Sequence, residues 1–347
     1  VNYDRSFKKY YKMKKILVIG NALVDVMTMM THDSNLEKFA LPKGSMQLGD
    51  KAKSDMVKSE TLHFNRALTS GESAANTIHG LAMLGLKTGF IGSIGKDELG
   101  DFFEKDMKYA GINTMLIRRN SVTGTAVAII SPDSERTFAT YLGAAVELEA
   151  DDIKAEHFDG YDILYLEGYL IFNKSLVETA CRIAKEKKMK IALDLASYNV
   201  VDAKLADFKE IVEKYVDIVF ANEEEARSFT GMEPAEALNY ISKFCEVVVI
   251  KVGSEGSWVK RGEETIKIGT AKVNLKDTTG AGDLYASGFL YGYARNEKLE
   301  ICGRYGSVLA GHVIEIVGAR MDESRFKQIK SSIESPLPEI LNSVMRS

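Results

Sequence analysis

Short apolar runs alternate with longer amphipathic segments along most of the chain. Apolar runs that end at a glycine or a polar residue are typical of strands buried on both faces of a parallel sheet. The runs of this kind are Lys15–Gly20, Phe90–Gly95, Ile163–Leu166, Ile191–Asp194, Ile218–Ala221 and Val247–Val252. Helical periodicity predicts helices at Ser73–Leu84, at Asp101–Ala110 and around 174–187, 204–214, 223–230 and 235–243. This alternation predicts an α/β fold, with a mostly parallel sheet and helices on both of its faces.

Two regions depart from this alternation. Residues 26–70 are polar and contain only short strand-like pieces. Residues 114–142 contain a predicted hairpin, in which Thr125–Ile130 and Arg136–Tyr141 flank a Ser-Pro-Asp-Ser turn. We expect both regions to form a smaller sheet outside the main one. The predicted division is therefore a large domain of residues 13–25, 71–113 and 143–335, with a small β lid of residues 26–70 and 114–142.

Composition narrows the classes of function. The 347 residues are 45% hydrophobic and 27% charged, which is ordinary for a globular chain. A net charge of -4 and the lack of a basic cluster make nucleic acid an unexpected partner, and no apolar run approaches transmembrane length. Cys181, Cys245 and Cys302 match no metal or redox spacing, so we expect buried thiols in a reducing, cytoplasmic compartment. Residues 1–12 have no signal-peptide pattern and are interpreted as an extension before Met13.

The most distinctive stretch is Asp277-Thr278-Thr279-Gly280-Ala281-Gly282-Asp283, which precedes small and aromatic residues at helical spacing. A glycine-rich turn that opens a helix gathers unpaired N–H groups at the positive end of the helix dipole. Such a place suits an anion, most simply a phosphate. Asp283 would lie in the first turn, where its carboxylate can accept a proton from a group held against that phosphate. The alternative is an ordinary tight turn with Asp283 as a cap, but the length of the pattern favours the phosphate site.

Polar residues follow several predicted strands at the edge where ligands of open α/β sheets bind. Asn21 and Asp25 follow the first strand, and Asn222 begins the acidic segment after Ala221. A glycine-containing turn follows Val252. Two alternatives stay open, because Asn21 and Asp25 also suit a simple turn, and carboxylates are favoured in the first turn of any helix.

On these residues the chain resembles the PfkB or ribokinase-like family of carbohydrate and nucleoside kinases, from about Lys14 to Met321. Asp277–Leu290 is similar to the C-terminal signature of the family and is the most specific match. The resemblance implies a ribokinase-like three-layer fold with a small β-sheet lid. It also implies ATP as the phosphoryl donor, Mg²⁺ as a cofactor and K⁺ as a further candidate ion. Relatives are monomers or homodimers paired through the lid, so either state is expected here.

The resemblance assigns roles to particular residues. Asp283 matches the catalytic base, and Gly280, Ala281 and Gly282 match the backbone anion hole. Asn222 and Glu225 match an Asn-x-x-Glu element that supports Mg²⁺ indirectly. The implied nucleotide-binding residues are Asn222, Glu225, Lys251, Gly253, Ser254, Gly256 and Thr279. Asp277 and Thr279 fall where relatives bind a monovalent cation.

The acceptor side resembles adenosine kinases, because Gly20–Asp25 reads Gly-Asn-x-x-x-Asp. On that resemblance Asp25 and Asn76 hold sugar hydroxyls and direct a 5′-hydroxyl toward Asp283. The other substrate-binding candidates are Asn21, Gly71, Glu72, Arg136, Glu167 and Tyr169. We therefore expect an ATP-dependent kinase acting on the primary hydroxyl of an adenosine-like nucleoside or a sugar. The alternatives are a ribokinase- or fructokinase-type sugar kinase and a catalytically impaired nucleoside or sugar sensor.

One departure from the family pattern bears on the acceptor. The family has two adjacent glycines where this chain has Gly71-Glu72. A glutamate adds bulk and charge at a place of close approach and disfavours the backbone conformations that glycine adopts. Glu72 therefore changes the substrate or impairs activity, unless its side chain turns outward and leaves the pocket intact.

Overall fold

A computed structural model describes residues 13–30, 36, 39–43, 46–61, 64, 66–131 and 136–334. Its larger sheet has nine strands, and seven of them are parallel, with an antiparallel hairpin at one edge. In spatial order the strands are β14 (Glu264–Ile268), β13 (Ser257–Arg261), β12 (Val247–Lys251), β11 (Ile218–Asn222), β10 (Lys190–Asp194), β9 (Ile163–Glu167), β1 (Ile16–Ile19), β5 (Thr88–Gly95) and β6 (Asn113–Arg119). The predicted mostly parallel α/β sheet is confirmed.

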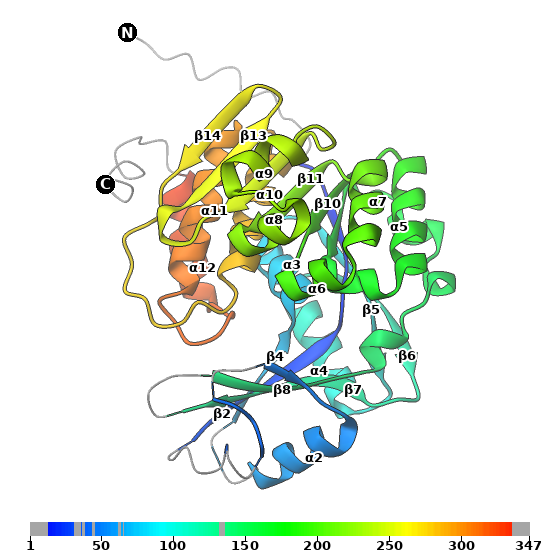
Figure 1. Cartoon of the computed structure of the whole chain (residues 1–347). Coiled ribbons are helices and arrows are strands. Elements are labelled where there is room, and N and C mark those ends of the chain that lie inside the picture. Colours follow the sequence, from blue (N-terminus) through cyan, green and yellow to red (C-terminus); the bar gives the residue numbers. More distant parts are fainter. Residues whose placement is uncertain are drawn as a thin grey trace.

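Helices cover both faces of this sheet (Figure 1). On one face pack α3 (Ser73–Met83), α4 (Glu98–Tyr109), α10 (Ala281–Ala294), α11 (Leu299–Val313) and α12 (Glu323–Glu334). On the other face pack α5 (Lys174–Glu186), α6 (Tyr198–Ala203), α7 (Leu205–Tyr215), α8 (Glu223–Thr230) and α9 (Pro234–Ile241). In β1, Ile16 and Val18 join the first core while Leu17 and Ile19 join the second. Burial on both faces explains why these strands read as unbroken apolar runs.

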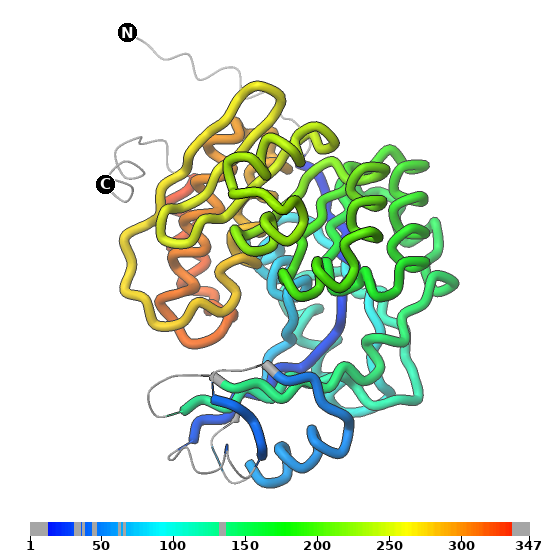
Figure 2. Tube along the Cα trace, viewed as in Figure 1, coloured from blue at the N-terminus to red at the C-terminus, as the bar shows by residue number. Residues whose placement is uncertain are grey.

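A second, five-stranded sheet forms a smaller lobe, to which α2 (Lys51–Glu60) belongs (Figure 1). Its strands, in spatial order, are β3 (Met46–Leu48), β8 (Arg136–Gly143), β7 (Thr123–Ile130), β2 (Leu23–Met29) and β4 (Arg66–Gly71). Figure 2 shows that this lobe combines chain segments that are far apart in the sequence. Strands β7 and β8 pair antiparallel, as the hairpin pattern predicted.

The division between the sheets differs from the predicted boundaries at β6. Residues 114–142 were expected in the lid, yet β6 pairs with β5 and belongs to the larger sheet. As the outermost strand it is only partly buried, so it lacks the apolar run that marks its neighbours. Helix α2 was also not predicted. Its residues are mostly polar, and Ser54 on its buried side bonds Thr125 of β7 at 3.0 Å.

Two further sequence expectations can be compared with the structure. Cys181, Cys245 and Cys302 are free and buried, as expected from their spacing. In the described part of the chain, no helix has the length and apolar character needed to cross a membrane.

Candidate active site

The carboxyl ends of the parallel strands define where the candidate site lies. Strands β5 and β6 lie on one side of β1 in the larger sheet, and β9 to β12 lie on the other side. The strand order therefore reverses beside β1, and a crevice at the carboxyl ends of β1 and β9 is the expected ligand site. Asn21 follows β1, and Glu167, Asp194, Asn222 and Lys251 end the next four strands along the sheet.

Close packing between α10 and α3 brings the first turns of the two helices together. Gly280 caps α10 in the left-handed conformation with φ 76°, which glycine adopts without strain. Farther along, the Ser287 hydroxyl donates to the carbonyl of Thr77 at 2.8 Å. A Cβ on Gly80 would lie 2.6 Å from Oγ of Ser287, so only a glycine permits this separation. The small residues of α10 thus place Asp283 against α3.

Asp283 is held by two side chains of α3. The Ser73 hydroxyl donates to Oδ1 at 2.7 Å, and the Asn76 amide donates to Oδ2 at 3.0 Å. Burial raises the pKa of Asp283 to about 6, while these two hydrogen bonds act in the opposite direction. The group is therefore ionised at neutral pH, yet more basic than an exposed aspartate. Such a carboxylate is suited to general-base catalysis. Ser73 was not among the predicted site residues.

Beside Asp283 is a place for an anion. The N–H of Ala281 donates to the carbonyl of Thr278 at 3.1 Å, so the turn itself uses this predicted donor. In the described part of the chain, the N–H groups of Gly282 and Asp283 have no hydrogen-bond partner. A Cβ on Gly282 would lie 3.1 Å from Nζ of Lys251, which places an ammonium group beside these donors. The arrangement fits a phosphoryl group.

Lys251 belongs to an ion pair that the sequence reasoning did not identify. Its Nζ lies 3.1 Å from Oδ2 of Asp194, and both side chains are largely buried. Burial lowers the pKa of Lys251, but Asp194 and Glu225 together hold it above the ordinary lysine value. Asp194 ends a predicted strand. The rule that ligands bind at the carboxyl ends of such strands would therefore have identified it.

Asn222 and Glu225 form a reciprocal capping box at the start of α8. Asn222 Oδ1 accepts from the N–H of Glu225 at 2.8 Å, and Glu225 Oε2 accepts from the N–H of Asn222 at 2.7 Å. The alternative interpretation of this segment, a helix start that is enriched in carboxylates, therefore agrees with the structure. Glu225 is also buried, and burial raises its pKa to about 7, against the opposing charge of Lys251. The charges of Lys251, Asp194 and Asp283 act on Glu225, and its indirect support of a metal ion stays a prediction.

The predicted nucleotide-binding turn follows β12. Gly253 and Gly256 have φ angles of 53° and 96°, and Ser254 lies between them in a short 3₁₀ helix, Gly253–Glu255. A Cβ on Gly256 would lie 1.9 Å from the carbonyl oxygen of Ile268. Glycine is required there, and the turn places its backbone at the same sheet edge as Lys251.

Asp277 organises the loop before α10. Its Oδ1 accepts from the N–H of Thr279 at 3.0 Å and from the Thr279 hydroxyl at 2.8 Å. Its Oδ2 accepts from the N–H of Gly318 at 2.7 Å. These bonds give Asp277 a structural role, and cation binding by Asp277 and Thr279 stays a prediction.

On the acceptor side, Glu167 connects the end of β1 to the start of α3 through hydrogen bonds. Its Oε1 accepts from the N–H of Asn21 at 2.6 Å, and its Oε2 accepts from the N–H of Ala74 at 2.9 Å. Burial raises its pKa to about 7. Since both oxygens accept from the backbone, Glu167 is better described as a positioning residue than as a substrate ligand.

Asp25 packs against the backbone of Gly71. A Cβ on Gly71 would lie 2.0 Å from Oδ1 of Asp25, so this glycine is required. The guanidinium of Arg320, which was not predicted, donates through Nε to the carbonyl of Ser70 at 3.0 Å and lies near enough to Asp25 to feel its charge. Asn76 is 6% exposed, and among the described residues its Oδ1 has no hydrogen-bond partner.

Glu72 has the conformation of a glycine. Its φ is 79° and its ψ is 157°, and its side chain forms no capping bond at the start of α3. Burial, followed by the charges of Glu167, Asp25 and Asp283, raises its pKa well above the usual value. Glu72 in turn raises the pKa of Tyr169, second only to burial. The charges of these acidic groups therefore act on Glu72, which is partly exposed, and the direction of its side chain stays a prediction.

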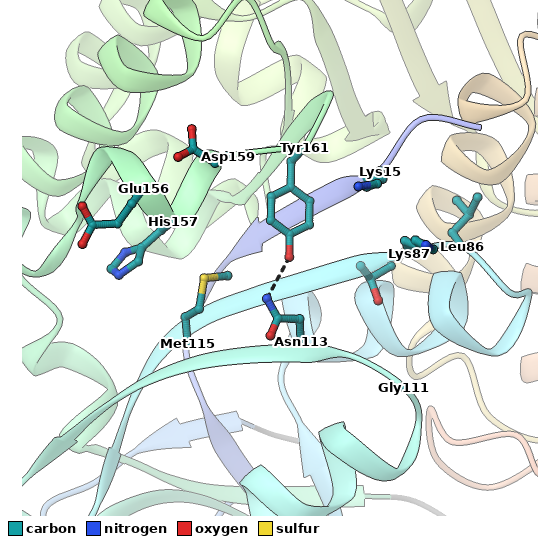
Figure 3. A pocket seen from close by; sticks show the side chains of 12 residues that line it. Lys15, Leu86, Lys87, Gly111, Asn113, Met115, Glu156, His157, Asp159 and Tyr161 are labelled. Carbon is teal, nitrogen blue, oxygen red and sulfur yellow. Dashed lines mark hydrogen bonds between the residues drawn. The ribbon is translucent and has the colours of Figure 1, made fainter. Parts of the chain in front are cut away.

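One predicted residue has no described side chain, and one pocket lies away from this site. Arg136 begins β8, but its side chain lies outside the described part of the structure. A pocket of about 460 Å³, lined partly by Lys15, Thr88 and Asn113, lies at the opposite, amino ends of β1, β5 and β6 (Figure 3). In it the Asn113 amide donates to the hydroxyl of Tyr161 at 3.1 Å. It contains none of the candidate site residues described above.

Comparison with known proteins shows the family to which the chain belongs. A family model described as pfkB family carbohydrate kinase matches residues 55–324. An uncharacterised sugar kinase of Archaeoglobus fulgidus is 31% identical over 248 residues, which is 70% of this chain and 96% of that protein. The 5-dehydro-2-deoxygluconokinase of Bacillus subtilis is 30% identical over 271 residues, which is 74% of this chain and 83% of that protein.

Solved structures extend the likeness to the whole fold. A probable sugar kinase from Rhizobium etli superposes with a TM-score of 0.83 at 33% identity, covering 92% of this chain and 98% of that one. The adenosine kinase of Sinorhizobium meliloti superposes with a TM-score of 0.82 at 33% identity, covering 92% of this chain and 99% of that one. The predicted ribokinase-like fold is therefore confirmed.

Proposed function

Because the chain belongs to the pfkB family of carbohydrate kinases, and is thus a phosphotransferase with a hydroxyl acceptor, we propose that it phosphorylates the primary hydroxyl of an adenosine-like nucleoside or a sugar. ATP is the expected donor for this family. The observation that carries the proposal is the placement of Asp283. Its carboxylate is fixed by Ser73 and Asn76 beside two N–H groups at the start of α10 that have no hydrogen-bond partner among the described residues.

In this proposal Asp283 takes the proton from the attacking hydroxyl. The N–H groups of Gly282 and Asp283 and the ammonium of Lys251 stabilise the charge on the transferring phosphoryl group. Bound Mg²⁺ supplies further charge neutralisation. Among the described residues no three metal-ligating side chains converge, which suits an ion held mainly by phosphate and water, with Glu225 in support. A K⁺ site at Asp277 and Thr279 is a separate proposal.

An adenosine-like nucleoside is the first candidate acceptor. The Sinorhizobium meliloti protein, an adenosine kinase, matches nearly the full length of this chain at 33% identity. A sugar is the second candidate, because curated relatives include sugar kinases. A binding protein without turnover is the third, because Glu72 adds a carboxylate to the acceptor side. We also propose that the small lobe acts as a lid in a monomer or a lid-paired homodimer.

A steady-state assay with ATP and Mg²⁺ tests these alternatives. Adenosine, ribose, fructose and 5-dehydro-2-deoxygluconate are compared as acceptors, and AMP or the sugar phosphate is measured directly. Turnover of adenosine with the highest kcat/KM is the expected result. Asp283→Asn should abolish turnover while it leaves nucleotide binding intact. Retained turnover in that variant would contradict the assigned base, and saturable binding without turnover in the wild type would favour the sensor.

A further inference from the structure

One short segment after α11 connects the two sides of the candidate site. The N–H of Gly318 donates to Oδ2 of Asp277 at 2.7 Å. A Cβ on Gly280 would lie 2.5 Å from Cβ of Ala319, so Ala319 packs directly against the turn that begins α10. The next residue, Arg320, instead extends its side chain to the acceptor side. The segment therefore contacts both the phosphate side and the acceptor side.

The guanidinium of Arg320 binds strand β4 of the small lobe. Its Nε donates to the carbonyl of Ser70 at 3.0 Å, and its Nη2 donates to the same carbonyl and to the Ser70 hydroxyl. The carboxylate of Asp106, in α4 of the larger lobe, accepts from the Ser70 hydroxyl at 2.5 Å and lies 3.6 Å from the guanidinium. A guanidinium can make these contacts together because its donors form a fixed planar fork. Strand β4 is thus held to the larger lobe at Ser70.

The residue after Ser70 lies against Asp25, which is proposed to bind the acceptor. A Cβ on Gly71 would lie 2.0 Å from Oδ1 of Asp25, so the carboxylate packs on the Gly71 backbone. Gly71 shares a peptide bond with the carbonyl that accepts from Arg320. The positive charge of Arg320 and the negative charge of Asp25 also act on each other. The guanidinium therefore fixes the backbone against which Asp25 is positioned.

Arg320 is an unusual choice for a position of this kind. Its side chain is only 12% exposed, and Nη1 is buried without a hydrogen-bond partner in the described part of the structure. Burial lowers the pKa of Arg320 to about 10, so the group is still charged at neutral pH. Replacement of a buried ion pair by apolar side chains is often neutral or favourable for stability. Stability alone therefore does not account for this arginine, whereas a role in positioning does.

We propose that Arg320 is a positioning residue that holds the acceptor side at the distance from the phosphate turn at which the acceptor hydroxyl meets Asp283. This inference rests on the proposed function and adds a residue to it. Arg320 does not touch the reacting atoms. It acts through β4 on Asp25, and the two residues before it connect the same segment to the start of α10.

Arg320→Met tests the inference in the steady-state assay with ATP and Mg²⁺. The measured quantities are kcat/KM for the best acceptor, the KM for ATP, and the ratio of phosphorylated acceptor formed to ATP consumed. We expect kcat/KM for the acceptor to fall by about tenfold or more, because a small displacement of the acceptor misaligns its hydroxyl. The KM for ATP should stay close to that of the wild type, and the product ratio should fall because water competes with the misaligned hydroxyl. Loss of stability alone would lower the amount of active enzyme without changing this ratio.

Arg325→Met is the matched control, since the nearby Arg325 lies in α12 and pairs with Glu315 at 3.1 Å. It should leave kcat/KM and the product ratio unchanged. If Arg320→Met does not fold, Arg320→Lys takes its place. That variant keeps the charge but lacks the planar fork, so it should still lower kcat/KM for the acceptor by about threefold or more.

Wild-type kcat/KM and product ratio in Arg320→Met, or in Arg320→Lys where the first variant does not fold, would overturn the inference. Absence of turnover with every acceptor in the wild type would instead refute the phosphotransfer proposal. The rise in melting temperature with each acceptor and with a non-hydrolysable ATP analogue then decides. Loss of the rise with the acceptor alone in Arg320→Met supports the inference. Equal rises in both proteins, or no rise with any acceptor in the wild type, overturn it.

Discussion

The Asn76 amide donates a hydrogen bond to Oδ2 of Asp283 at 3.0 Å, although the two residues lie 207 positions apart in the chain. With the Ser73 bond to Oδ1, it joins the first turn of α3 to the first turn of α10. The basicity of the proposed catalytic carboxylate therefore depends on a helix from the other end of the sequence.

The pH dependence of turnover should report the bonds to Asp283. Because the base must be ionised, kcat/KM should fall as the pH drops through about 6, the pKa of Asp283. Ser73→Ala removes a hydrogen bond that favours the ionised form, so it should raise this pKa and move the acidic limb upward by about one pH unit. Asn239→Ala, on the exposed side of α9, is the control. An acidic limb that stays in place in Ser73→Ala would show that another group controls it.

Asp283→Asn should make the protein more stable at pH 8 than the wild type. The folded-state pKa of about 6 lies above the ordinary value of 3.8, so folding disfavours the ionised form. The stability that the protonated group contributes is complete below about pH 4 and is lost as the pH rises through 6. The free energy of unfolding of the variant should therefore exceed that of the wild type by on the order of 1–3 kcal/mol at pH 8 and by little at pH 4. Melting curves across this range measure the difference, with Glu263→Gln at an exposed turn as the control. A constant difference across the pH range would contradict the assigned pKa.

Loss of Lys251 should destabilise the fold. Lys251→Met leaves the carboxylate of Asp194 buried without its ion-pair partner, and Glu225 loses a neighbouring positive charge. Removing one member of a buried pair costs about 3–5 kcal/mol, which urea unfolding would detect as a lower midpoint. Arg227→Met breaks an exposed pair with Glu233 and should cost less than about 1 kcal/mol. Equal effects of the two substitutions would indicate that the Lys251 pair is screened by solvent.

Gly71→Ala should weaken acceptor binding selectively. The added Cβ would lie 2.0 Å from Oδ1 of Asp25, so the carboxylate must move away from its present position. We expect the KM for the acceptor to rise by about tenfold or more, while the KM for ATP stays close to that of the wild type. Gly269→Ala is the matched control, because a Cβ there meets no atom within 4 Å. An unchanged acceptor KM would remove Asp25 from the acceptor site.

The pattern of hydrophobic and polar positions predicted the strands that are buried on both faces. It did not predict the elements that are only partly buried. Strands β1, β9, β10, β11 and β12 appear as apolar runs because each packs against helices on both sides. Edge strand β6 and helix α2 are only partly buried, so their patterns are weak. The hairpin of β13 and β14 at the other edge was missed for a similar reason, because β14 is mostly exposed.

The candidate site also contains residues that the sequence indicated and residues that it did not. Glycine-rich turns and strand ends indicated Asp283 and Asn222 as candidates, since these signals are local, and the resemblance to the family added Lys251. Asp194 was missed although it ends a predicted strand. Ser73 and Arg320 were missed because their roles come from partners far away in the chain.

The sequence by itself determined the family and the class of reaction, through the resemblance of Asp277–Leu290 to the family signature. It also determined the turn that presents Asp283, because short-range backbone chemistry specifies a glycine-rich helix start. Only the tertiary structure decided the surroundings of Glu72. The sequence places a glutamate after Gly71, but the groups that lie near it depend on how α3 packs against β1, β9 and α10. That packing places Glu72 among Asp25, Glu167 and Asp283, because the residues beside it are each held by one of those carboxylates.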